Sequence, residues 1–114
     1  MTPRTACKAL TLSAALVIGM TFALTARAAD EATVKLYQTK CAACHAADGS
    51  GNTTVGKALM LKDIRDPEVQ KMTDAELTTL FTKGKGKMPA NEKALKPEQI
   101  KALVEYTREL AQKK

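Results

Sequence analysis

Aromatic and metal-binding side chains are scarce in this sequence. Its 114 residues include two Tyr, two Phe, one His, three Cys and no Trp. A single histidine argues against most zinc sites, which combine several cysteines and histidines. Aromatic residues interleaved with basic ones, a common pattern in nucleic-acid-binding proteins, are missing as well. These shortages argue against two large classes of function.

A long uncharged stretch lies near the N terminus. Arg4 and Lys8 precede it, residues 9–26 carry no charge, and Ala26-Arg27-Ala28 has the small-residue pattern of a cleavage site. The pattern predicts a secretory signal peptide over residues 1–28, cleaved after Ala28, and therefore a periplasmic protein. The alternative is an uncleaved membrane anchor, but Thr and Ser residues interrupt the apolar stretch. Cys7 is expected to leave with the leader.

Removal of the leader changes both the size and the charge of the chain. Residues 29–114 then form one domain of 86 residues, which can bury only a limited share of its surface. The leader holds three of the 18 basic residues and none of the 12 acidic ones, so 15 basic residues remain against 12 acidic ones. The resulting formal charge of +3 is too modest to indicate binding to nucleic acid.

The two remaining cysteines stand in Cys41-Ala42-Ala43-Cys44-His45. This Cys-x-x-Cys-His run is the attachment pattern of c-type haem. Two thiols on one helical turn can form thioethers to the two vinyl groups of one haem, and the following histidine can bind the iron. We therefore expect one covalently attached haem c, held by Cys41 and Cys44, with His45 as an iron ligand.

Three other uses of this motif are weaker. A thioredoxin-like redox pair belongs to a strand-helix-strand pattern, which is not visible here. A zinc site would need a fourth ligand from a carboxylate or another subunit, because no Cys follows Cys44 and His45 is the only histidine. A disulfide would close a very short loop and leave the histidine unexplained.

Helical periodicity dominates residues 29–114 and predicts an all-α fold. Asp30 or Glu31 can begin a first helix, and the capping box in residues 73–76 begins a middle helix, with Met72 and Leu77 forming a hydrophobic staple. A brief helical turn is expected over residues 57–61, where packing accounts for the apolar Met60. Pro97 begins a last helix, whose apolar stripe includes Ile100, Leu103, Val104, Thr107 and Leu110.

A second informative segment, Lys83-Gly84-Lys85-Gly86-Lys87-Met88-Pro89, separates the last two helices. The glycines let the backbone pass close to a cofactor, and Pro89 disfavours a helical setting at Met88. A thioether is a soft, neutral donor that stabilises reduced iron. Met88 is therefore the candidate sixth ligand, and ordinary core packing is the alternative.

Together these features resemble a class I c-type cytochrome, especially the short soluble monohaem members from bacteria and photosynthetic organisms. The resemblance covers the first helix, Cys41 to His45, the Asp48-Gly49 and Gly51 turn, the middle helix, Gly84 to Pro89 and the last helix. It implies a small fold of three to five helices around one covalent haem, with the terminal helices crossing. It further implies that Tyr37 meets Leu103 and Tyr106 at that crossing, and that His45 and Met88 bind the iron.

One departure from the family concerns the loop after the histidine. Many members have a proline there, near the carbonyl that accepts a hydrogen bond from the second ring nitrogen of the ligand, but residues 46–66 contain none. A backbone carbonyl in residues 54–56 is the expected substitute.

The expected function is one-electron transfer, without enzyme activity, by a monomer that does not stay in the membrane. Its partners would be redox proteins, and Lys83, Lys85 and Lys87 form a basic rim that could steer an acidic docking surface. The alternative is that these lysines are ordinary solvated surface charges with no role in docking. The rival functions are a five-coordinate haem protein that acts as a peroxidase-like enzyme or gas sensor, and a thiol-disulfide module.

Overall fold

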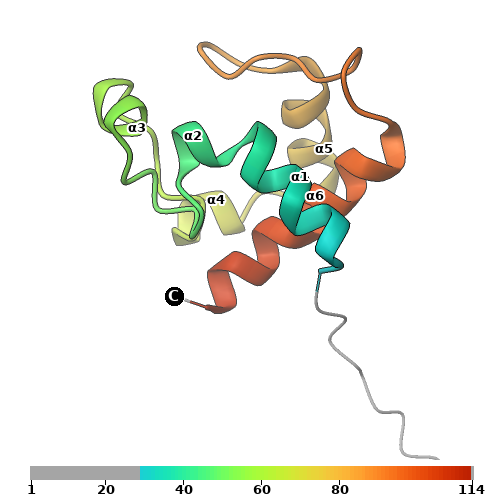
Figure 1. The fold of residues 1–114 in the computed structure, drawn as a ribbon, viewed down its shortest axis with the longest axis horizontal. Helices are drawn as coiled ribbons and strands as arrows, with labels where there is room; N and C mark the ends of the chain where they lie inside the picture. The colour runs from blue at the N-terminus through green and yellow to red at the C-terminus, as the bar shows by residue number, and fades with distance from the viewer. Residues whose placement is uncertain (1–28, 114) are drawn as a thin grey trace, which may run out of the picture.

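The computed structural model describes residues 29–113, and within them the secondary structure is helical (Figure 1). The helices in chain order are α1 (Glu31–Lys40), α2 (Ala42–His45), α3 (Thr54–Ala58), α4 (Pro67–Gln70), α5 (Asp74–Lys83) and α6 (Pro97–Gln112). The all-α prediction is confirmed. The predicted signal peptide, residues 1–28, lies outside the described residues. Among the described residues, no helix combines the length and the apolar character needed to cross a membrane.

The three longer helices begin at the signals read from the sequence. The Asp30 side chain accepts a hydrogen bond from the Thr33 backbone nitrogen at 2.7 Å and caps α1. At the start of α5, Thr73 and Glu76 form the reciprocal bonds of a capping box. Pro97 occupies the first turn of α6, where its missing N–H has no partner to lose. These starts depend on neighbours in sequence, which is why they could be predicted.

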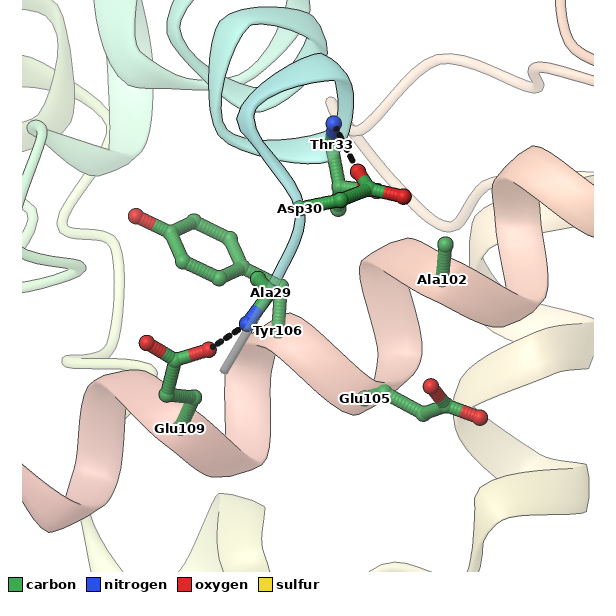
Figure 2. A pocket seen from close by; sticks show the side chains of 7 residues that line it. All are labelled: Ala29, Asp30, Thr33, Ala102, Glu105, Tyr106 and Glu109. Atoms are coloured by element: carbon green, nitrogen blue, oxygen red, sulfur yellow. Dashed lines mark hydrogen bonds between the residues drawn. The ribbon is translucent and has the colours of Figure 1, made fainter. Parts of the chain in front are cut away.

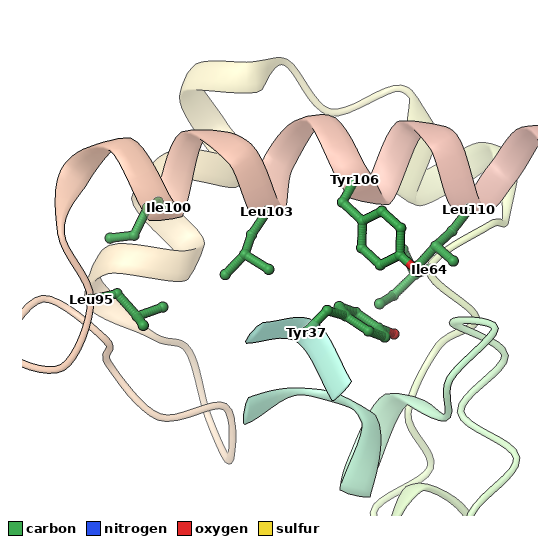
Figure 3. Packing of buried hydrophobic residues seen from close by; sticks show 7 residues of the cluster. All are labelled: Tyr37, Ile64, Leu95, Ile100, Leu103, Tyr106 and Leu110. Carbon is green, nitrogen blue, oxygen red and sulfur yellow. The ribbon is translucent and has the colours of Figure 1, made fainter. Parts of the chain in front are cut away.

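The core is centred where α1 crosses α6 (Figures 1 and 3). The rings of Tyr37 and Tyr106 meet edge to face, with centroids 5.1 Å apart and planes at 72°. Leu103 lies on the same side of α6 and is 2% exposed. An aromatic pair of this geometry adds about 0.5–1.5 kcal/mol beyond the area that it buries. The predicted contact between the two terminal helices is confirmed.

The segment between α2 and α5 departs from the prediction. A helical turn was expected over residues 57–61, but α3 covers Thr54–Ala58, because the Thr53 side chain accepts a hydrogen bond from the Gly56 nitrogen and caps the helix earlier. The short α4 was not expected. Arg108 of α6 holds its C-terminal end, because the guanidinium donates to the carbonyl oxygen of Gln70, the last residue of α4, at 3.0 Å and to that of Met72, just beyond it, at 2.5 Å. These hydrogen bonds join residues far apart in the chain, so the local sequence does not predict them.

Met60 was expected to pack in an apolar run, and this prediction is wrong. Its side chain is 87% exposed, and its backbone has the positive φ of 50° that is costly for residues other than glycine. The turn that follows α3 imposes this conformation, because the Leu61 nitrogen bonds to the Gly56 carbonyl at 2.9 Å. An apolar residue is therefore held on the surface by the backbone around it.

We expect Met60→Gly to raise the free energy of unfolding by about 0.5–1 kcal/mol, because glycine adopts a positive φ without strain. Met60→Ala keeps the strained backbone and is the matched control, which should stay within about 0.5 kcal/mol of the natural protein. Urea denaturation of both variants measures the difference. Equal stability of the glycine and alanine variants would show that the backbone at this position is not strained.

Candidate functional site

An apolar cleft of about 240 Å³ lies beside the core, bordered by α1, α2, α5 and α6. Aliphatic, aromatic and thioether side chains supply most of its wall, among them Val69, Met72, Leu80, Phe81, Leu95 and Leu103. Three of the four predicted site residues, Cys41, His45 and Met88, line this same cleft. The fourth, Cys44, is half-buried on α2 and does not line it. The fold thus brings Met88 from a distant loop to the residues of the Cys-x-x-Cys-His motif.

His45 is the last residue of α2 and is half-buried at the edge of the cleft. Its Nδ1 atom is buried and has no hydrogen-bond partner among the described residues. The expected hydrogen bond to a carbonyl of residues 54–56 is therefore not found in this structure. Burial lowers the pKa of the His45 imidazole, which favours the neutral ring. A neutral imidazole is the form that binds a metal ion.

The backbone on either side of His45 is tied to its surroundings. The Tyr37 hydroxyl donates to the Ala46 carbonyl at 2.9 Å, and the Gly51 nitrogen donates to the His45 carbonyl at 2.8 Å. The Thr53 hydroxyl donates to the Cys44 carbonyl at 3.0 Å. Ala46 has a positive φ of 63°, a conformation that persists only where neighbours hold it. These bonds fix the direction in which α2 presents its histidine.

No disulfide joins the two motif cysteines, Cys41 and Cys44. Burial, and secondarily the neighbouring Cys44, raise the pKa of the Cys41 thiol to about 11. Redox-active Cys-x-x-Cys pairs depend on the opposite shift, because the thiolate is the reacting form. The environment of Cys41 therefore argues against the thiol-disulfide alternative.

Met88 is positioned by a tight turn between α5 and α6. Gly84 and Gly86 have φ values of 70° and 59°, and Lys85 and Met88 exchange two backbone hydrogen bonds of 3.1 and 3.0 Å. Asn91 also lines the cleft and clamps this loop, since its side-chain amide donates to the Phe81 carbonyl at 3.0 Å. Asn91 was not among the residues predicted from the sequence. An amide residue just after a Gly- and Pro-rich segment was the available signal, because Asn side chains often bond to nearby backbone.

The three loop lysines differ in their surroundings. The Lys83 ammonium pairs with the Glu92 carboxylate at 2.5 Å, and both side chains are largely exposed. Lys85 and Lys87 are exposed on the turn before Met88. Because the charge of Lys83 is partly neutralised by Glu92, Lys85 and Lys87 are the better candidates for a basic rim.

The residues of the cleft fit a covalently attached haem. The walls are apolar, the His45 imidazole and the Met88 thioether line the cleft as borderline and soft donors for iron, and two thiols stand one helical turn apart. Within the described residues, no cluster of three or more His, Cys, Asp or Glu side chains could hold a bare metal ion. These donors therefore suit a haem iron better than a metal ion bound by protein side chains alone.

Comparison with known proteins agrees with this geometry. Residues 28–106 match the family described as cytochrome c oxidase, cbb3-type, subunit III. Over 80 residues the chain is 38% identical to cytochrome c6 of Gloeothece citriformis, with 69% of each chain covered. The structure resembles the solved KustC0563 c-type cytochrome, with a TM-score of 0.63 and 32% identity, covering 68% of this chain and 95% of that one.

Proposed function

The chain belongs to the cytochrome c family, and we propose that Cys41 and Cys44 would hold its haem through thioethers while His45 and Met88 would bind the iron. As a family member the protein is a haem-dependent electron carrier with covalently bound haem c, and its partners are redox proteins. The family match does not itself name the residues that bind the haem and its iron. It is supported chiefly by one observation, the meeting of Cys41, His45 and Met88 in a single apolar cleft.

When bound, haem supplies a one-electron couple between Fe(III) and Fe(II). The two thioethers would keep the group in a domain too small to enclose it. Burial lowers the pKa of the His45 imidazole and so favours the neutral ring, which can donate a lone pair. Met88 offers a second donor, and the clamp by Asn91 limits its motion. The apolar wall excludes water. With both residues bound, the iron would offer no site to oxygen or peroxide, so we propose electron transfer without bond chemistry.

The rival five-coordinate haem protein requires Met88 to be absent from the iron. The presence of Met88 and His45 in the same cleft supports the carrier instead. Peroxide cleavage also calls for polar side chains on the distal side, whereas the wall here is mostly apolar. We therefore propose that the protein is not an enzyme.

We further propose that the carrier is periplasmic and monomeric, with residues 1–28 removed after Ala28. The sequence pattern supports this proposal, because Arg4 and Lys8 precede an uncharged stretch that ends in the small-residue pattern Ala26-Arg27-Ala28. Lys85 and Lys87 are proposed to face acidic redox partners, with the exposed haem edge near the Cys41 to Cys44 attachment as the point of transfer.

Intact-mass analysis of the exported protein tests the attachment. We expect a chain that begins at Ala29 and carries one haem. Cys41→Ala and Cys44→Ala should each lose one thioether and lower the yield of stably attached haem, while Ala43→Ser, an exposed position in the same motif, should keep both. A natural protein without covalent haem would contradict the proposed role of the two cysteines.

A further inference from the structure

A second cavity, of about 230 Å³, lies between the start of α1 and α6 (Figure 2). Its size is close to that of the apolar cleft, but its wall is polar and includes Asp30, Thr33, Glu105 and Glu109. Figure 2 shows the backbone nitrogen of Ala29 pointing at the Glu109 carboxylate. The two atoms, Ala29 N and Glu109 Oε2, are 2.6 Å apart although the residues are 80 positions apart in sequence.

The nitrogen in this contact is the atom that cleavage after Ala28 would change. In the uncleaved chain it is an amide with one hydrogen and no charge. Hydrolysis of the Ala28–Ala29 bond adds water across that bond, so the nitrogen becomes an amine that is protonated at neutral pH. The product carries a positive charge and three hydrogens, and its bond to a carboxylate becomes a charge-assisted one.

The surroundings of Glu109 suit this product. The Glu109 side chain is 20% exposed, and its other oxygen accepts from the Lys113 ammonium, so each carboxylate oxygen has its own partner. Hydrogen bonds from Lys113 and from Ala29 hold the pKa of Glu109 below its usual value. Asp30 adds a carboxylate to the same cavity, and the Tyr106 ring forms part of its wall. The added cation therefore meets more acidic groups than basic ones.

We propose that Glu109 is the binding site for the α-ammonium group of the processed chain, so that cleavage itself adds an ion pair across the crossing of α1 and α6. This inference rests on the proposed cleavage after Ala28. The pair would join the start of α1 to α6 beside Tyr106, so processing of the N terminus would add a contact between the two terminal helices.

The test is the rate at which a dilute activated ester acylates the α-amine of the haem-loaded protein at neutral pH, read by mass spectrometry of the N-terminal peptide. Glu109→Gln should raise this rate about three- to tenfold, because it removes the charge that holds the ammonium form. Glu105→Gln is the matched control from the same helix and cavity, and Lys113→Met controls for the second partner of Glu109. Both should change the rate less than about twofold.

A chain with one glycine added before Ala29 completes the design, because it moves the ammonium by about 3.8 Å. In this background, Glu109→Gln should lose its effect on the rate. The proposal is overturned if Glu109→Gln and Glu105→Gln act alike, or if the added glycine leaves the effect of Glu109→Gln unchanged. Urea unfolding of each variant confirms that the compared proteins are folded. An exported chain that starts elsewhere would contradict the cleavage, whereas the acylation rates of a chain made to begin at Ala29 test Glu109 separately.

Discussion

Replacement of Met88 by alanine is expected to abolish the weak far-red absorption band of the oxidised protein and to let carbon monoxide bind the reduced protein. The variant removes the thioether that we propose as the sixth ligand, and it leaves space in an apolar cleft. Because a thioether stabilises reduced iron, the reduction potential should fall by on the order of 100 mV, within the range that axial ligands control.

Met60→Ala is the matched control for Met88→Ala. Met60 is 87% exposed and does not line the cleft, so its loss should leave the far-red band and the potential unchanged. Visible spectra and potentiometric titration of the two variants compare them directly. If the band persists in Met88→Ala, the assignment of Met88 as the sixth ligand is wrong.

A second large effect is expected at Gly56, where any side chain would collide with backbone. A Cβ atom added there would lie 2.2 Å from the Gly51 carbonyl oxygen and 2.5 Å from the Cys44 carbonyl oxygen. These atoms belong to the attachment helix and its turn, and they cannot rotate away as a side chain can. Gly56→Ala should therefore lower the free energy of unfolding by about 3 kcal/mol or more and displace Cys44.

Gly86→Ala is the control for Gly56→Ala. Gly86 has no heavy atom within 4 Å of an added Cβ, but its φ of 59° strains an alanine, so the expected cost is only about 1 kcal/mol. Urea denaturation gives both values, and the yield of haem-loaded protein reports on Cys44. A smaller loss for Gly56→Ala than for Gly86→Ala would contradict the close backbone contact.

The sequence predicted the features that depend on near neighbours. Asp30, the Thr73 capping box and Pro97 begin their helices as expected, because capping involves residues within four positions. The apolar stripe on α6 is buried as predicted, because the helical spacing of its apolar residues decides which face of the helix meets the core. The contact of Tyr37 with Tyr106 came from family resemblance and is also present.

The predictions that were wrong or incomplete depend on contacts between residues far apart in the sequence. Met60 was assigned to the core from its apolar neighbours, but the turn after α3 holds it outside. The roles of Gly56 and Asn91 were not predicted. The Cys44 and Gly51 carbonyls leave no room for a side chain at Gly56, and the Asn91 side chain donates to the Phe81 carbonyl. Lys83 was predicted to act with Lys85 and Lys87, but its ion pair with Glu92 distinguishes it from them. Tertiary geometry decides each of these roles.

The proposal that this is a six-coordinate one-electron carrier is tested most directly by a reductive titration followed by visible spectroscopy, with carbon monoxide added at the end. A six-coordinate carrier should give a single one-electron transition, low-spin spectra in both states and no spectral change with carbon monoxide. High-spin spectra, or rapid carbon monoxide binding by the natural protein, would mean that Met88 does not bind the iron and would contradict the proposed ligation.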